Sequence, residues 1–183
     1  MARVPKVKFK INLAEIFGSR DFGRGTKEAI GQAVIDRIVE RTQTGIDKNG
    51  KRFKGYSAAY KDSLAFKVNG KSDLVNLTLT EDMLSSMTII EQTAQTITIG
   101  FDDSTENAKA YGHISGMEGH PTIKKGKVRD FLGLPQRDID LITDEFQSEV
   151  DIVSSIGRSG SREAFEDNIL RAIDALTGEI EGE

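Results

Sequence analysis

An apolar stripe in the C-terminal half of the chain is the feature that most limits its fold. After Pro135, apolar side chains recur at intervals of three or four residues: Ile139, Ile142, Phe146, Val150, Val153 and Ile156. This spacing places them on one face of an α-helix, and proline is favoured as the first residue of a helix. The carboxylates between them then form the solvated face. We predict a long amphipathic helix over residues 135–156, which needs a core to pack against.

Three other segments have the alternation of half-buried strands. Residues 6–13 place Val7, Phe9, Ile11 and Leu13 on one side, and Lys6, Lys8, Lys10 and Asn12 on the other. Residues 86–92 and 95–101 are rich in Thr and Ile, which favour strands. We expect these two segments to pair antiparallel around Thr93-Ala94.

These elements predict an α+β domain. Its sheet is small and mostly antiparallel, with residues 127–132 as a candidate fourth strand, and two main helices pack on it, 26–43 and 135–156. A short helix is expected over 58–67, and a short helix or irregular turn over 106–114. The domain is expected to span residues 1–156.

A C-terminal helical extension is expected beyond that domain. Gly157-Arg158-Ser159-Gly160-Ser161 has the composition of a flexible break, and a helix over 162–177 and an acidic tail follow it. The break either makes the last helix a movable arm or turns it back onto the core. The second interpretation is the simpler one.

Charge is distributed unevenly along the chain. Residues 1–71 contain 16 Lys/Arg and 7 Asp/Glu, net +9, whereas residues 72–183 contain 9 and 22, net −13. The candidate interface residues are the basic side chains of the first strand, of a turn near residue 50 and of a Gly-rich loop: Lys6, Lys8, Lys10, Lys48, Lys51, Arg52, Lys124 and Lys125. They fit either the acidic part of a neighbouring copy or phosphate groups of DNA. A third reading is two solvated faces with no partner.

The sequence offers little for catalysis or for a cofactor. Gly70-Lys71-Ser72 lacks the glycine that a phosphate-binding loop needs six residues before its lysine, where Ala65 stands. The two histidines, His113 and His120, are too few for a zinc site without help from carboxylates. The chain has no cysteine and no apolar run long enough to span a membrane. We therefore expect a non-enzymatic protein without cofactor or metal, made and used in a soluble compartment.

Several short boxes follow one another in a set order. They are Asn49-Gly50-Lys51-Arg52-Phe53, Thr80-Glu81-Asp82-Met83-Leu84-Ser85-Ser86, Ile99-Gly100, Tyr111-Gly112-His113-Ile114-Ser115-Gly116 and Arg129-Asp130-Phe131-Leu132-Gly133. In that order, over about residues 26–156, they resemble the virion morphogenesis, or tail completion, protein family of tailed bacteriophages. Relative to the family pattern, Glu81 replaces Gly, Met83 replaces Leu and Asp130 replaces Pro, and the Tyr–His interval is shorter.

The resemblance implies a structural role. It implies a neck or connector protein that completes the phage tail and joins it to the head, as a homo-oligomeric, hexameric ring around the DNA channel. Its partners would be tail terminator, head-completion or connector proteins, and DNA would pass nearby without specific binding. It would be assembled in the bacterial cytoplasm and end in the virion. The alternative is a small DNA-binding or regulatory module using the basic N-terminal half.

The matching residues are expected to define the fold rather than to catalyse a reaction. They are Gly50, Phe53, Thr80, Ser86, Gly100, Tyr111, His113, Gly116, Arg129, Phe131, Leu132 and Gly133. In the last box, the two apolar residues would anchor an extended strand in the core. Arg129 is a candidate for bidentate pairing with a carboxylate.

Overall fold

The computed structural model describes residues 4–19, 22–68, 73–77, 82–116 and 127–158. The chain divides into two compact units, Met1–Thr143 and Asp144–Glu183. The first unit is an α+β domain, as predicted. In the second, the described part is the helical stretch 144–158. The predicted helix 162–177 and the acidic tail lie outside the described residues.

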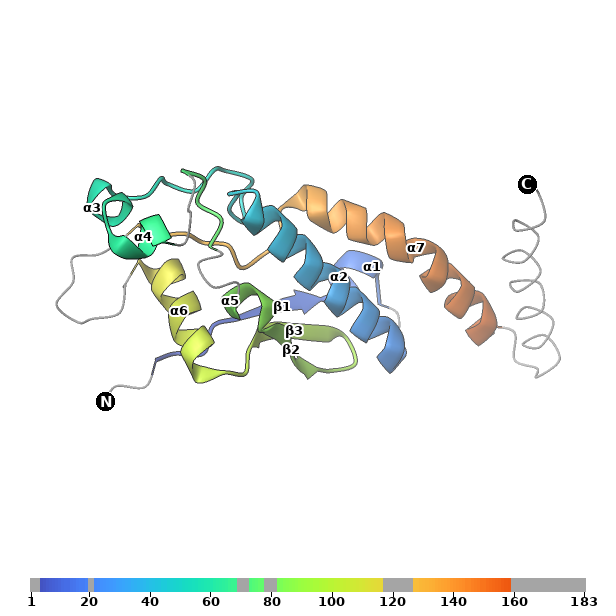
Figure 1. The fold of residues 1–183 in the computed structure, drawn as a ribbon. Coiled ribbons are helices and arrows are strands. Elements are labelled where there is room, and N and C mark those ends of the chain that lie inside the picture. The colour runs from blue at the N-terminus through green and yellow to red at the C-terminus, as the bar shows by residue number, and fades with distance from the viewer. Residues whose placement is uncertain (1–3, 20–21, 69–72, 78–81, 117–126, 159–183) are drawn as a thin grey trace, which may run out of the picture. The chain divides into compact units, whose positions relative to one another are not determined.

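A three-stranded antiparallel sheet lies at the centre of the first unit (Figure 1). Its strands are β1 (Lys8–Asn12), β2 (Met87–Gln92) and β3 (Thr96–Phe101), in the order β1-β3-β2. The predicted hairpin is confirmed, and a bulge interrupts the pairing of β2 with β3 between Ile89 and Glu91. Since β3 is the central strand, β1 and β2 form the two edges of the sheet.

Helix α2 (Arg24–Gln43) covers one face of this sheet (Figure 1). Its apolar residues Ile30, Val34 and Ile38 follow one another at intervals of four, on one face of the helix, and all three are buried. At Gly31, an added Cβ atom would lie 2.4 Å from Cδ1 of Ile89, so the helix touches β2 closely there. The face that carries Ile89 and the fully buried Ile97 is therefore the inner face of the sheet.

The helices differ from the predictions mainly at the short ones. Helix α1 (Leu13–Phe17) follows β1 directly and was not predicted, because Leu13 fits the strand alternation. Its cap is the side chain of Asn12, which accepts from the Ala14 N–H. The predicted helix 58–67 is two helices, α3 (Ala58–Lys61) and α4 (Leu64–Val68), and α5 (Asp82–Ser85) is an additional turn of helix.

Residues Ser104–Ser115 form a regular helix, α6, which settles the choice left open by the sequence. The carboxylate of Asp103 accepts hydrogen bonds from the N–H groups of Thr105 and Glu106, so the helix begins with a strong cap. It ends at Gly116, which has a φ of 70° in the left-handed region. Helix α7 (Gln136–Arg158) matches the predicted 135–156 and runs into the predicted break at Gly157.

The prediction of a strand over 127–132 is wrong. This segment is irregular, and none of it belongs to the sheet. Its backbone bonds go elsewhere: the Arg129 N–H donates to the His113 carbonyl (2.8 Å), and the Asp130 carbonyl accepts from the Lys48 N–H (2.9 Å). Phe131 is nevertheless buried, with its ring 6.4 Å from that of Phe101. An irregular segment that buries a side chain in the core can therefore have the sequence pattern of a strand without pairing in a sheet.

Gly100 occupies a position on β3 where a side chain does not fit. A Cβ atom there would lie 2.8 Å from the Val7 carbonyl oxygen and 3.0 Å from Cδ1 of Ile90. We expect Gly100→Ala to lower the free energy of unfolding by about 1–3 kcal/mol, because backbone must shift to admit the methyl group. Gly55→Ala is the control, since nothing lies within 4 Å of its added Cβ. Urea unfolding of both variants checks this, and equal midpoints would contradict it.

Candidate functional site

Three of the sequence boxes meet around the irregular segment 127–133. The turn that holds Gly50 is joined to Asp130 by the Lys48 N–H bond and by an ion pair between Lys48 Nζ and Asp130 Oδ2 (2.8 Å). The end of α6 is joined to it through the bond from Arg129 to His113. The turn, the end of α6 and residues 129–133 thus form one connected cluster, which we call the box cluster.

Arg41, near the end of α2, ties this cluster to the start of α7. Its Nη2 donates to the carbonyls of Phe131 (2.8 Å) and Gly133 (2.7 Å), and its Nη1 donates to Asp138 Oδ2 (2.8 Å). The Arg41 side chain is 8% exposed and that of Asp138 is 15% exposed, so the ion pair is largely shielded from solvent. The guanidinium fixes two backbone carbonyls and one carboxylate at once. Its role here is positional.

Sequence reasoning missed Arg41, although a signal was present. It follows Ile38 by three residues and therefore lies on the same face of α2 as the apolar stripe. A charged residue on a buried stripe is rare unless a partner meets it. The position therefore called for a buried partner, which only the fold identifies as Asp138.

Arg129, which is buried, and His113 are joined by a backbone hydrogen bond in the box cluster. The Arg129 guanidinium carbon lies 5.4 Å from the centre of the Tyr56 ring, a cation–π contact. His113 is half-buried as a residue, but its Nδ1 atom is enclosed and has no hydrogen-bond partner among the described residues. Burial, with a smaller contribution from the charge of Arg129, lowers the pKa of His113 to about 4. Burial also raises the pKa of Tyr56.

Among the described residues, no group of three or more His, Asp or Glu side chains is placed to hold a metal ion. His113 is neutral near pH 7 and shut off from solvent at Nδ1, which suits packing better than proton transfer. His120, the other histidine, lies outside the described residues, as does Thr80 of the second box. Within the part of the chain that the structure describes, no helix is long and apolar enough to cross a membrane.

The predicted basic interface residues fall into separate groups. Lys6, Lys8 and Lys10 are exposed on and before β1. Lys8 and Lys10 alternate with the buried Ile11, so they leave the sheet on the face opposite α2. Lys51 and Arg52 are exposed in the turn after α2, whereas Lys48 is engaged with Asp130. Lys124 and Lys125 lie outside the described residues. The described basic residues thus belong to two separate parts of the chain, the β1 segment and the turn after α2.

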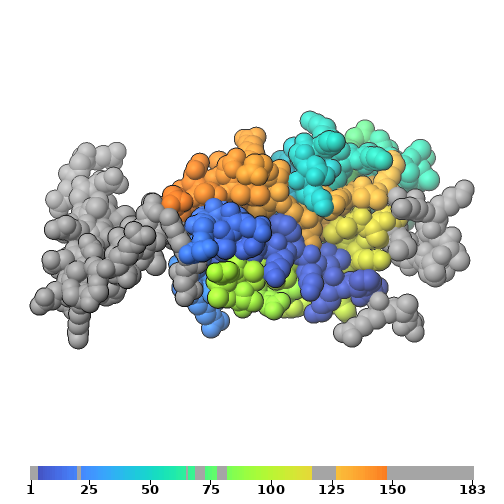
Figure 2. All heavy atoms as spheres, turned by 180° about the vertical axis from the view of Figure 1, so that it is seen from behind, coloured from blue at the N-terminus to red at the C-terminus, as the bar shows by residue number. Residues whose placement is uncertain are grey.

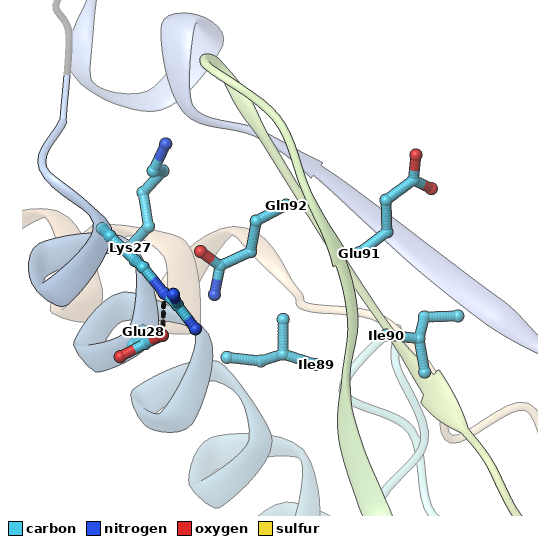
Figure 3. A pocket seen from close by; sticks show the side chains of 7 residues that line it. Lys27, Glu28, Ile89, Ile90, Glu91 and Gln92 are labelled. Atoms are coloured by element: carbon cyan, nitrogen blue, oxygen red, sulfur yellow. Dashed lines mark hydrogen bonds and ion pairs between the residues drawn. The ribbon is translucent and has the colours of Figure 1, made fainter.

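A surface groove runs between the first turns of α2 and the edge strand β2 (Figure 3). It is lined by Arg24, Lys27, Glu28, Ile89, Ile90, Glu91 and Gln92. Ile89 and Gln92 point toward α2, whereas Ile90 and Glu91 point away from it (Figure 3). The groove therefore wraps around the open edge of β2, and sequence reasoning did not predict it. An Arg24–Glu28 ion pair (2.8 Å) closes one wall.

In comparisons with known proteins, no family model, no curated protein and no solved structure matches this chain.

Proposed function

We propose that this protein is a structural component of a tailed bacteriophage virion, which completes the tail and joins it to the head. The order of the five boxes along the chain carries the proposal, because it resembles the tail completion family. Three of the five boxes meet in the box cluster, where the Arg129 N–H donates to the His113 carbonyl and Phe131 is buried, as fold-defining residues would be. This suits a protein that acts by presenting shaped surfaces.

In this proposal, assembly depends on surface complementarity. The protein forms a homo-oligomeric ring around the DNA channel and contacts tail terminator, head-completion or connector proteins. The acidic half lines the channel, where like charge lets DNA slide without sticking. Lys6–Lys10 then face a neighbouring protein rather than the lumen. A ring structure with these lysines lining its lumen would contradict this arrangement.

Composition analysis of purified virions tests the proposal. Particles banded on a density gradient are expected to contain the protein in a small, fixed copy number, found with the tail or neck fraction after controlled disruption. Quantitative mass spectrometry against the major tail protein measures this ratio. If the protein stays in the soluble fraction of the lysate and is missing from infectious particles, it is not a virion component.

A second candidate is a DNA-binding module, favoured by the exposed Lys6, Lys8 and Lys10 on and just before β1. Binding by phosphate contacts falls steeply as salt rises. A gel-shift titration across salt concentrations separates the two readings. The structural proposal predicts only weak association near physiological salt, whereas tight binding that survives there would favour the DNA-binding module.

A further inference from the structure

The β1 edge of the sheet has backbone groups that point away from the domain. The Leu13 N–H donates to the Gln95 carbonyl (2.9 Å), which fixes which residues of β1 bond to β3. In an antiparallel pair these alternate, so Phe9 and Ile11 bond to β3, while Lys8 and Lys10 direct their N–H and C=O groups outward. The described residues supply no partner for these outward groups.

The β2 edge is open in the same way. The Thr93 N–H donates to the Thr96 carbonyl (2.9 Å), so Glu91 bonds to Thr98 and Gln92 directs its backbone groups outward. Beyond the bulge, Ile89 also turns its backbone groups to the open side, where the groove lies (Figure 3). Among the described residues, the sheet thus ends in two different unpaired edges, and unpaired edges attract further strands.

The two edges carry opposite charge on the same face of the sheet. Lys8 and Lys10 project on the face opposite α2, and Glu91 projects on that face too (Figure 3). All three side chains are exposed. Figure 2 shows the N-terminal segment, in dark blue, on the surface beside the yellow-green β2–β3 hairpin. A strand placed beside β1 therefore meets lysines, and a strand placed beside β2 meets a glutamate.

These charges disfavour two of the three ways in which copies can pair edge to edge. Two β1 edges would bring lysines together, and two β2 edges would bring two Glu91 carboxylates together; like charges on neighbouring strands are destabilising. A β1 edge beside a β2 edge places Lys10 next to Glu91 instead. Both strands are antiparallel to β3, so they run parallel to each other, and a second copy in the same orientation adds a parallel strand.

We propose that the β1 edge of one copy adds to the β2 edge of a second copy, with Lys10 beside Glu91, as the contact between neighbouring subunits. Such a contact is heterologous, because each copy uses its β1 edge to pair with one neighbour and its β2 edge to pair with another. It closes into a ring when the rotation between copies permits. The inference deepens the proposed function and rests on it for the ring, but the contact itself is a property of the purified protein.

Engineered cysteines test the contact cleanly, because the chain has none of its own. Lys8→Cys and Thr88→Cys place one thiol near each edge and leave Lys10 and Glu91 intact. The two variants are mixed under mild oxidation at about 1 mM protein, where even weak association is populated. We expect the mixed disulfide dimer to exceed either like-with-like dimer by roughly tenfold, given the opposite effects of unlike and like charges. A mixed dimer at or below the like-with-like dimers, or no dimer at all, overturns the proposal.

A charge exchange tests the named pair. Lys10→Glu, added to the Lys8→Cys variant, is expected to abolish the excess of mixed dimer, and Glu91→Lys, added to the Thr88→Cys variant, is expected to restore it. Both residues are exposed, so unfolding midpoints should stay near those of the parent variants. If the charge exchange does not restore the mixed dimer, the proposed pairing of Lys10 with Glu91 is overturned. If the mixed dimer does not form but phage lacking the gene have defective tails, the contact is overturned and the proposed function stands. If the mixed dimer forms but phage lacking the gene have normal tails, only the proposed function is overturned.

Discussion

Replacing Arg41 with Met is expected to lower the free energy of unfolding by about 3–5 kcal/mol, the usual cost of removing one partner of a buried ion pair. The variant leaves the Asp138 carboxylate without its partner, in a place where its side chain is 15% exposed. It also leaves the carbonyls of Phe131 and Gly133 without their donor. Urea unfolding followed by circular dichroism measures the change.

Two further variants make this result specific. Arg37→Met removes an arginine from the same helix. Its pair with Glu40 is longer (3.9 Å) and more exposed, so this variant should change stability by less than about 1 kcal/mol. Arg41→Met combined with Asp138→Leu removes both charges and should recover part of the loss. If Arg41→Met stays within about 1 kcal/mol of the parent protein, the guanidinium does not hold the box cluster together.

Acid is expected to destabilise the protein through His113. The pKa of His113 is lowered from 6.5 to about 4, chiefly by burial and then by Arg129, so the unfolded chain binds the proton more readily. The contribution of neutral His113 to the free energy of unfolding is therefore fully present above pH 6.5. It is lost as pH falls from 6.5 to about 4, and below that pH this residue causes no further loss. The pKa difference corresponds to a loss of unfolding free energy of at most about 3 kcal/mol, because His113 is partly exposed to solvent.

Carboxylates titrate near the lower end of this window, so a variant must isolate the histidine. His113→Gln is expected to flatten the slope of unfolding free energy against pH between 6.5 and 5, where carboxylates contribute least. Equal slopes in the His113→Gln variant and the parent would show that the imidazole titrates freely in the folded state.

Regular periodicity explains which parts of the fold were predictable. Helices α2 and α7 and the β2–β3 hairpin carry apolar patterns long enough to identify the element without tertiary information. The prediction of a strand over residues 127–132 was wrong because burial of Phe131 gives a strand-like pattern in the sequence. Whether a segment pairs as a strand depends on whether it lies beside an edge of the sheet. Helix α1 failed because a single turn has too few residues to show a helical period.

The candidate surfaces were predictable only in part. The lysines of β1 were visible as a basic strand face, and the structure places Lys8 and Lys10 there, exposed. The β2 edge could not be predicted from the sequence. It depends on the strand order that makes β2 an edge strand and on the bulge that turns Ile90 and Glu91 to one face. The Arg41–Asp138 pair joins residues 97 positions apart and likewise needs the fold.

The most direct test of the proposed role is a nonsense mutation of this gene in its phage, with electron microscopy of the lysate. Completion and joining of the tail by this protein predict filled heads beside separate or abnormal tails, with infectivity restored by a plasmid copy. Joined, intact particles, or normal plaque formation on a non-suppressing host, would contradict that role and favour the DNA-binding alternative.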